Sequence, residues 1–500
     1  MKIAFHTLGC KVNQYESEAM AQMFRQRGHE IVDERDFADV YVINTCTVTA
    51  VADKKSRQYI RRMKKVNPAS IIAVTGCYAQ IRPDEVAGIA GVDIVTGTNE
   101  KRALIDYVEA HAKAHTEAAS ADADTNCRLC IHPYEELNDF EDMGIVSSRE
   151  TRTRAYIKIQ EGCNRFCSYC VIPYARGPVR SRPLDDIVAE AKALIDGGCK
   201  ELVLTGINTA QYDMEGRDLY GASDSTAAAS ADSTSAASAD SNAAELFGVE
   251  KAIAAINALE GDFRVRLSSL EPAVVDSDYV KRLFKYDKLC HHLHMSAQSG
   301  SDKVLQAMNR PYDRAQYLEM ARALYDFDPC YGLSTDIIVG FPGEKEKDFD
   351  ESYALVAECC FCRTHVFKYS KRPGTKAAEM KEQVSPQVKQ RRSDELLDAA
   401  VKAARIFFEV NIAYAGEGRT ETVLFEEIVE ARENGDGIVK GEPLLTGYTG
   451  NYIRVYVPIR TLGAGATGGK DGAGGEMLGA FAEVRLESLF SDGVTASVVQ

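Results

Sequence analysis

The chain has 500 residues, enough for about three domains, and 45% of its residues are hydrophobic. Its net charge of −15 argues against a protein that coats nucleic acid non-specifically, although local basic patches are compatible with it. No apolar run reaches membrane-spanning length, and the N-terminus lacks the apolar stretch of a signal peptide. We therefore expect a cytoplasmic protein without a membrane span, whose fourteen cysteines are reduced.

Short apolar segments alternate with helical patterns through the first hundred residues. Three of these segments, KIAFHTLGC, ADVYVINTC and SIIAVTGC, end in Cys10, Cys46 and Cys77. The alternation predicts an N-terminal domain over residues 1–110 with a parallel sheet and crossover helices. Because the carboxyl ends of parallel strands share one edge, the three thiols are expected to lie at one ligand site. Buried structural thiols at strand ends are the alternative.

An Ala-, Asp- and Ser-rich segment follows, and we expect residues 111–150 to form a linker. It contains Cys127 and Cys130, a lone C-x-x-C motif for which zinc, redox and accidental interpretations all stay open. Six strand-like segments then alternate with helical patterns over residues 151–385. This alternation predicts a partial or full βα (TIM-like) barrel, whose ligand site lies at the C-terminal ends of its strands. Within it, residues 221–244 have the composition of a disordered insertion.

The remainder of the chain predicts a helix and a small β-domain. A helical pattern over residues 386–414 connects the barrel to short alternating strands over residues 415–490. Small all-β barrels of this kind often bind nucleic acid, although this one is acidic and has few aromatic residues. The Gly-rich segment 463–475 within it is expected to be a flexible loop.

Two stretches of the chain are rich in Lys and Arg, residues 54–65 and 152–182. Each lies beside a group of cysteines in the sequence. Contact with nucleic acid is one interpretation, and a solvated helix face is the other.

The stretch EGCNRFCSYCVIP contains the thiols of Cys163, Cys167 and Cys170, with no fourth cysteine or histidine at a comparable spacing. A closed structural zinc site has four ligands, whereas iron–sulfur clusters are held by cysteines in close runs. Three thiols would leave one iron of a 4Fe–4S cluster open. That iron could bind the amine and carboxylate of S-adenosylmethionine. A zinc site completed by a distant cysteine is the alternative.

This loop resembles the signature of the radical S-adenosylmethionine superfamily, with Tyr169 at the position of its usual aromatic residue. The stretches TLGCKVNQYES, INTCTVT and VTGCYAQ resemble the N-terminal signatures of the methylthiotransferase family. Further matches are LVLTGINTAQYD, RLSSLEP, HLHMSAQSGSDKVLQAMNR, TDIIVGFPGE and FKYSKRPGT. The resemblance implies a fold of three parts: a parallel α/β domain, a βα barrel and a small C-terminal TRAM-like β-barrel that binds RNA.

The same resemblance implies the cofactors and their ligands. One 4Fe–4S cluster would be held by Cys163, Cys167 and Cys170, and an auxiliary 4Fe–4S cluster by the other trio, Cys10, Cys46 and Cys77. S-adenosylmethionine would be surrounded by side chains of three further motifs, with the candidates Asn208, Ser269, Glu271 and Gln298. Ordinary loop and cap roles are the alternative for these four residues.

The sequences around the cysteines resemble one branch of that family most. KVNQYES after Cys10, TVT after Cys46 and CNRFCSYCVIPYARGPVRSRP resemble the branch that modifies threonylcarbamoyladenosine. This implies an enzyme that inserts a methylthio group at carbon-2 of that nucleoside, next to the anticodon of tRNA. The implied partners are the tRNA anticodon loop and a reducing electron donor such as flavodoxin or ferredoxin. The alternatives are isopentenyladenosine in tRNA, a ribosomal-protein aspartate, and a non-catalytic iron–sulfur protein that binds RNA.

Overall fold

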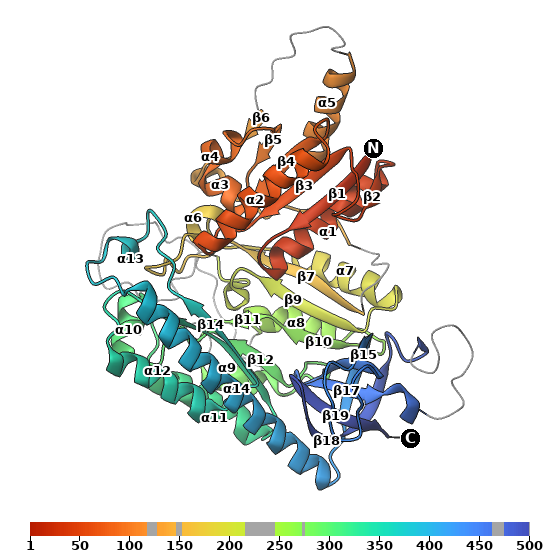
Figure 1. The fold of residues 1–500 in the computed structure, drawn as a ribbon, viewed down its shortest axis with the longest axis vertical. Coiled ribbons are helices and arrows are strands. Elements are labelled where there is room, and N and C mark those ends of the chain that lie inside the picture. Colours follow the sequence, from red (N-terminus) through yellow and green to blue (C-terminus); the bar gives the residue numbers. More distant parts are fainter. Residues whose placement is uncertain (118–127, 147–152, 216–245, 273–275, 463–474, 500) are drawn as a thin grey trace, which may run out of the picture.

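The computed structural model describes residues 1–117, 128–146, 153–215, 246–272, 276–462 and 475–499. The N-terminal domain lies at one end, a larger central domain follows, and a small β-barrel packs beside the central domain at the other end (Figure 1). The expected insertion 221–244 and nearly all of the expected loop 463–475 fall outside the described residues. Among the helices of the described part, none is long and apolar enough to cross a membrane.

The N-terminal domain is built on a parallel six-stranded sheet in the order β2-β1-β3-β4-β5-β6. Its strands are β1 (Lys2–Thr7), β2 (Glu30–Val32), β3 (Val40–Thr45), β4 (Ile71–Gly76), β5 (Ile94–Thr96) and β6 (Arg128–Cys130). Its helices are α1 (Lys11–Gln26), α2 (Ala50–Val66), α3 (Cys77–Ile81), α4 (Pro83–Ala87) and α5 (Leu104–Glu117). Side chains of α1 and α5 pack on one face, and those of α2, α3 and α4 pack on the other. Both central strands, β3 and β4, are therefore buried along their whole length.

The segment 111–150 is more structured than its composition indicates. The helix α5 runs on to Glu117, and β6 extends the N-terminal sheet by pairing with β5. A short 3₁₀ turn, η1 (Tyr134–Glu136), follows. The expected linker therefore contributes a strand to the N-terminal domain, and this strand carries Cys130. With only three residues, β6 is too short to show the alternation that identifies a strand in a sequence.

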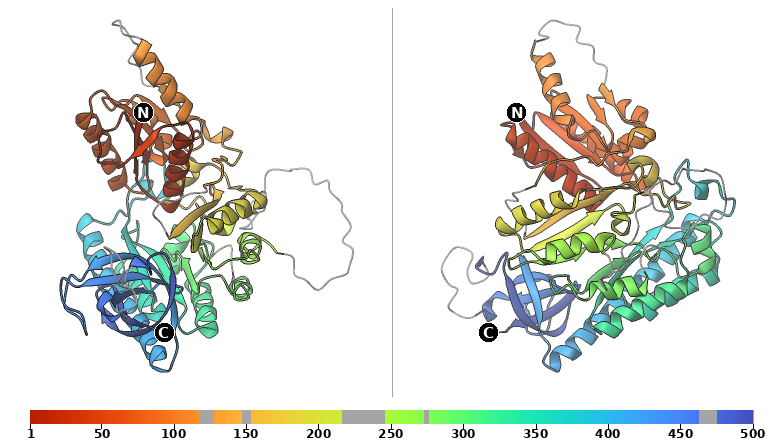
Figure 2. Two further views of the ribbon diagram at one scale, coloured as in Figure 1. Left: turned by 90° about the vertical axis from the view of Figure 1, so that its right-hand side faces the viewer. Right: turned by 180° about the vertical axis from the view of Figure 1, so that it is seen from behind.

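The central domain is a partial βα barrel made of two four-stranded sheets, ordered β10-β9-β7-β8 and β11-β12-β13-β14. The strands are β7 (Arg154–Glu161), β8 (Arg180–Ser181), β9 (Glu201–Gly206), β10 (Arg264–Leu267), β11 (Ser269–Leu270), β12 (His292–Met295), β13 (Gly332–Val339) and β14 (Arg363–Lys368). All neighbouring strands pair in parallel except β7 and β8. Because β11 follows β10 after one residue, the two sheets form one curved wall (Figure 2).

Helices cover the outside of this wall, and the core lies between the two layers. Among the helices that contribute to this core are α7 (Leu184–Asp196), α8 (Val249–Asn257), α9 (Ser277–Leu283), α11 (Arg314–Phe327) and α12 (Glu346–Cys359). The domain also contains the short helices α6 (Ile172–Arg176), α10 (Asp302–Ala307) and α13 (Lys376–Glu379) and the 3₁₀ turn η2 (Thr209–Gln211). In the described residues, β14 pairs with β13 alone, so the barrel is open. Its inner surface is therefore accessible from the side of the N-terminal domain.

The long helix α14 (Pro386–Gly416) packs along α12 and β14 and leads to the C-terminal domain. Its first turn is fixed by Ser385, whose side chain accepts a hydrogen bond from the Val388 amide, and by Pro386 at the first helical position. The C-terminal domain is a closed five-stranded barrel in the order β15-β16-β17-β19-β18. It contains β15 (Glu421–Glu430), β16 (Pro443–Thr449), β17 (Arg454–Pro458), β18 (Phe481–Phe490), β19 (Gly493–Val498) and the turn η3 (Ile459–Thr461). The predicted fold class is confirmed.

Buried arginines hold the C-terminal barrel against the central domain. Arg264 and Arg266 both pair with Glu201 inside the sheet of β9 and β10. Arg264 also donates to the Thr422 carbonyl at 3.2 Å, and Arg266 donates to the Gly450 carbonyl at 3.0 Å. A charge-assisted contact of this kind fixes orientation because the planar guanidinium directs its donors.

Candidate active site

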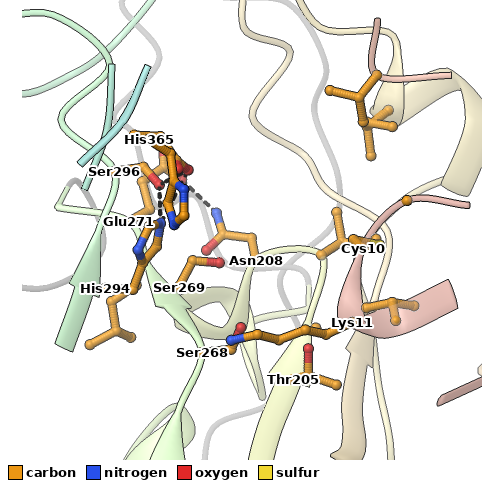
Figure 3. A pocket seen from close by; sticks show the side chains of 18 of the residues that line it. Cys10, Lys11, Thr205, Asn208, Ser268, Ser269, Glu271, His294, Ser296 and His365 are labelled. Carbon is orange, nitrogen blue, oxygen red and sulfur yellow. Dashed lines mark hydrogen bonds and ion pairs between the residues drawn. The ribbon is translucent and has the colours of Figure 1, made fainter. Parts of the chain in front are cut away.

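All ten residues predicted for cluster or cofactor binding line one pocket of about 740 Å³. The pocket lies between the carboxyl edge of the N-terminal sheet and the open inner wall of the central domain (Figure 3). Its size is typical of sites for small ligands and cofactors. The ten residues are Cys10, Cys46, Cys77, Cys163, Cys167, Cys170, Asn208, Ser269, Glu271 and Gln298. The structure thus brings all of them together, while their roles stay predictions.

The N-terminal trio of cysteines converges because two glycines allow close turns. Gly9, before Cys10, has φ of +111°, and a Cβ there would lie 2.8 Å from the Cβ of Cys46. Gly76, before Cys77, has φ of +97°, and a Cβ there would lie 2.5 Å from a backbone carbonyl oxygen. Only glycine tolerates both the conformation and the proximity. Cys10 caps the N-terminus of α1, where the helix dipole favours a negatively charged ligand group.

The central trio lies in the loop that follows β7. Cys170 donates its amide to the carbonyl of Cys167 at 3.0 Å, which closes a turn between the two thiols. Cys163 is anchored by its amide to the Gly177 carbonyl at 3.1 Å. Phe166, between the first two cysteines, has a φ of +45°, a conformation that strains a bulky residue. Such strain is found where the surrounding structure holds a loop in a functional shape.

Five of the six cysteines are buried or half-buried, which affects the protonation of their thiols. Burial and the neighbouring Cys77 raise the pKa of Cys46 to about 12, and burial and Cys167 raise that of Cys170 to about 12. The thiols of Cys46 and Cys170 are therefore protonated when free, and a metal group must displace these protons when it binds. Among the described side chains, no three His, Cys, Asp or Glu lie close enough to hold a single metal ion. The two donor sets in the pocket consist of thiols alone, a ligand chemistry that fits iron–sulfur clusters.

A buried arginine connects the two trios. Arg176 ends α6, directly after the central cysteine loop, and is fully buried. Its Nε donates to Cys77 Sγ at 3.2 Å, and its Nη2 donates to Asn13 Oδ1 at 2.6 Å. The guanidinium also forms a bidentate pair with Glu16 of α1. The segment that carries one trio therefore touches a thiol of the other trio.

Glu16 is the centre of this buried charge network. Lys101 Nζ lies 3.3 Å from its carboxylate and Lys158 Nζ lies 3.6 Å from it, in addition to Arg176. Burial alone would raise the pKa of Glu16, but these cations hold it well below its ordinary value. The carboxylate is ionised and compensates positive charge from both domains. The network therefore fixes the N-terminal domain over the pocket.

A second carboxylate, Glu271, organises the wall near the central trio. It accepts hydrogen bonds from Asn208 Nδ2 and Arg310 Nη1, each at 2.5 Å, and lies 3.2 Å from Arg165 Nε. Arg310 also donates to the Tyr169 hydroxyl at 2.8 Å. Sequence reasoning identified Asn208 and Glu271 but missed the two arginines. Arg165 lies inside the cysteine loop itself, which was the available signal.

The remaining predicted residues, Ser269 and Gln298, lie at strand ends on the same wall. Gln298 has a φ of +65°, and its amide donates to the Asp336 carbonyl at 2.8 Å. The Asp336 side chain accepts a hydrogen bond from Ser296 Oγ at 2.8 Å and lies 3.1 Å from His294 Nε2. The four candidates named from the sequence do not include these polar residues, and Asp336 lies within β13.

The sequence prediction also missed Lys11, which follows Cys10 and lines the pocket. Burial, with the nearby Arg266 and Arg154, lowers the pKa of Lys11 to about 8. In Figure 3 its side chain extends from α1 across the pocket toward Ser268 and Thr205 of the central domain.

The two basic stretches have different structural roles. In 152–182 the arginines Arg165, Arg176, Arg180 and Arg182 are buried, and each pairs with a carboxylate. For these four arginines the interpretation as a nucleic-acid surface is therefore wrong, because their charges are internal. In 54–65, by contrast, five basic side chains of α2 are exposed, namely Lys54, Lys55, Arg61, Arg62 and Lys65.

Known families match both large domains of the chain. The radical SAM superfamily matches residues 157–356, and the uncharacterized protein family UPF0004 matches residues 2–97. The solved structure of the radical S-adenosylmethionine methyltransferase TsrM from Kitasatospora setae, with a tryptophan substrate and a SAM analog bound, superposes with a TM-score of 0.51. The superposition covers 75% of each chain with 12% sequence identity, so it supports the fold alone. Fold and site together define a radical SAM enzyme with an added cysteine-bearing α/β domain.

Curated relatives narrow this class to a family. The threonylcarbamoyladenosine tRNA methylthiotransferase MtaB of Bacillus subtilis is 39% identical, over 91% of this chain and 89% of that protein. The protein of the same name from Thermotoga maritima is 34% identical, over 98% and 96%. A tRNA-2-methylthio-N(6)-dimethylallyladenosine synthase of Clostridium botulinum is 35% identical, over 86% of both. The chain belongs to the methylthiotransferase family, in the threonylcarbamoyladenosine branch.

Proposed function

We propose that this protein inserts a methylthio group at carbon-2 of threonylcarbamoyladenosine in tRNA. The observation that carries the proposal is the convergence of two cysteine trios, from different domains, on one pocket. Two of the relatives quoted above, 39% and 34% identical over 89% and 96% of their own lengths, are named as enzymes of this activity. The reaction also requires a one-electron reductant such as flavodoxin or ferredoxin. Because its substrate is tRNA, we place the protein in the cytoplasm.

The donor sets fit two 4Fe–4S clusters with one open iron each. Cys163, Cys167 and Cys170 would hold the first, and the trio of Cys10, Cys46 and Cys77 would hold the second. When bound, the first cluster and S-adenosylmethionine supply a radical that removes hydrogen from carbon positions no acid or base in water could activate, and the second carries the sulfur. The protein's own task is to hold both groups and the nucleobase in one water-poor space.

The wall around Glu271 would orient S-adenosylmethionine. Asn208, Ser269 and Gln298 present polar groups at neighbouring strand ends, which is where βα barrels bind their ligands. Arg165 and Arg310 fix the Glu271 carboxylate between the cysteine loop and Asn208. Because these partners are already paired, the wall is preorganised before any ligand enters.

The exposed basic side of α2 would contact the tRNA backbone. The helix begins beside the Cys46 loop, so its surface continues from the pocket mouth. An adenosine in an anticodon loop is unstacked at low cost and can enter a pocket while phosphates bind outside. The C-terminal barrel, held by Arg264 and Arg266, would contact a separate part of the tRNA, because it lies at the other end of the molecule (Figure 1).

Reversing two charges on α2 should weaken tRNA binding without affecting the site. We expect Lys55→Glu with Arg62→Glu to lower tRNA affinity at all salt concentrations and to reduce the salt dependence, by about one unit of log–log slope for each lost phosphate contact. Filter binding between low and moderate salt measures both. The control is Lys281→Glu with Lys347→Glu, two exposed residues on α9 and α12 of the central domain. Equal losses in both variants would contradict an RNA surface on α2.

The proposed reaction is tested by mass spectrometry of tRNA nucleosides. Cells lacking this protein should lose 2-methylthio-threonylcarbamoyladenosine and accumulate threonylcarbamoyladenosine, and the wild-type gene should restore the product. Loss of 2-methylthio-isopentenyladenosine instead, or an unchanged nucleoside profile, would overturn the proposal.

A further inference from the structure

Positive charge exceeds negative charge on the pocket lining. Six cationic side chains and two carboxylates, Glu271 and Asp336, line it. The cations are Lys11, Arg154, Arg165, Arg266, Arg310 and Arg363. A pocket with this balance suits a ligand that brings negative charge of its own.

Four of these six cations already pair with carboxylates of the protein. Arg154 and Arg266 pair with Glu201 at 3.2 and 2.9 Å. Arg165 and Arg310 pair with Glu271 at 3.2 and 2.5 Å. These pairs stabilise the wall. Because a carboxylate compensates part of each positive charge, the arginines attract a negatively charged ligand less strongly than an unpaired cation would.

Lys11 differs from these arginines. Its ammonium has no hydrogen bond or ion pair to any residue in the described ranges, and it is partly buried within the pocket. Figure 3 shows it extended into the space between α1 and the strand ends at Thr205 and Ser268. Arg363 also lacks such a partner in the described ranges, but it is exposed, so water solvates its charge. Removing an ammonium from water without an anionic partner costs free energy that a negatively charged ligand group recovers.

The chemistry of the substrate supplies such a group at the required place. Threonylcarbamoyladenosine carries threonine through a carbamoyl link on N6, which leaves the threonine carboxylate free. On the adenine ring, carbon-2 and the carbon that bears N6 both flank N1, so they lie on one edge. If carbon-2 faces the thiol trio that includes Cys10, the N6 substituent must extend from the same edge. Lys11 is the next residue after Cys10, and its flexible four-carbon stem reaches outward from there.

We propose that the Lys11 ammonium binds the carboxylate of the threonylcarbamoyl group and thereby selects this nucleoside over adenosines with uncharged N6 substituents. The assignment rests on the proposed function and adds the residue that recognises the substrate. A single directed charge pair in a partly dehydrated pocket provides both affinity and register. Placement of the carboxylate by Lys11 also fixes the distance of carbon-2 from the Cys10 trio.

The test combines a change in the protein with a change in the substrate. Lys11→Met keeps the stem and removes the charge, and Lys11→Arg keeps the charge. Two anticodon stem-loops are compared, one with threonylcarbamoyladenosine and one with its methyl ester, which lacks the negative charge. For each combination, binding and kcat/KM for methylthiolation are measured. Iron and sulfide contents of each variant establish that the neighbouring Cys10 still holds its cluster.

We expect Lys11→Met to lower kcat/KM for the natural stem-loop by about 10- to 100-fold, chiefly through KM. The same substitution should leave the methyl ester unaffected, and wild type should discriminate against the ester by a similar factor. Lys11→Arg should recover part of the loss. In a double-mutant cycle, this result means that the effects of Lys11→Met and of the methyl ester are not additive, which indicates a direct interaction between Lys11 and the carboxylate.

Other outcomes would overturn the assignment. Equal losses on both stem-loops would place Lys11 against a phosphate or against S-adenosylmethionine, and no loss on either would leave it without a role in binding. A wild-type protein that modifies neither stem-loop would overturn the proposed function and the Lys11 assignment with it. A wild type that modifies both stem-loops with equal kcat/KM would overturn the Lys11 assignment alone.

Discussion

Replacing Cys163 by alanine is expected to abolish both methylthiolation and the cleavage of S-adenosylmethionine. Replacing Cys10 by alanine should abolish methylthiolation but leave 5′-deoxyadenosine production intact. The reason is that the two thiols belong to separate trios: Cys163 lies in the loop after β7, and Cys10 lies at the carboxyl edge of the N-terminal sheet. Chromatography of 5′-deoxyadenosine and mass spectrometry of the RNA product measure the two activities in one reaction mixture.

A matched control for these two substitutions is Cys360→Ala. Cys360 is a partly exposed thiol at the end of α12, away from the pocket lining. This variant should retain both activities. If Cys10→Ala retained methylthiolation, or if Cys163→Ala still cleaved S-adenosylmethionine, the assignment of the trios to two functions would be wrong.

Replacing Glu16 by glutamine is expected to cause the largest loss of stability of any single conservative change at the domain interface. Glu16 compensates three buried cations, Arg176, Lys101 and Lys158. Glutamine has nearly the same shape but no charge, so it leaves these cations buried without their central anion. Removal of one partner from a buried ion pair costs about 3–5 kcal/mol. Chemical denaturation followed by fluorescence and circular dichroism measures the change.

The control for Glu16→Gln is Glu85→Gln. Glu85 pairs with Arg57 at 2.9 Å, but its side chain is exposed. We expect this variant to lose at most about 1 kcal/mol, as is usual for surface pairs. Similar midpoints for the two variants would contradict a central role of Glu16 in holding the domains together. A selective loss of iron from the Glu16 variant would show that the Arg176–Cys77 contact depends on the same network.

The order of strands and helices was predictable because their patterns are strong. In β3 and β4 each residue is buried, and such apolar runs followed by helical periodicity indicate a parallel sheet. Short elements were not predictable. The strand β6 has three residues in a segment whose composition indicates a linker, and it is defined only by its partner β5. The start of α1 at Lys11 likewise has no capping signal in the sequence, because Cys10 is not an ordinary capping residue.

The cysteine ligands of the site were predictable, and most of their partners were not. Cysteines at strand ends or in a close run indicate metal or cluster ligands from the sequence alone. The arginines around them looked like an RNA surface in the sequence. Whether an arginine faces solvent or a buried carboxylate depends on residues far away in the chain, such as Glu16 for Arg176 and Glu271 for Arg310. Charge alone does not reveal that pairing.

The iron and sulfide contents of the anaerobically reconstituted protein test the central claim most directly. Two trios that each hold a 4Fe–4S cluster predict about eight irons and eight sulfides per chain. Alanine at Cys10, Cys46 and Cys77 together should reduce both numbers by half. A protein that instead takes up one zinc ion per trio, and neither iron nor sulfide, would contradict the account.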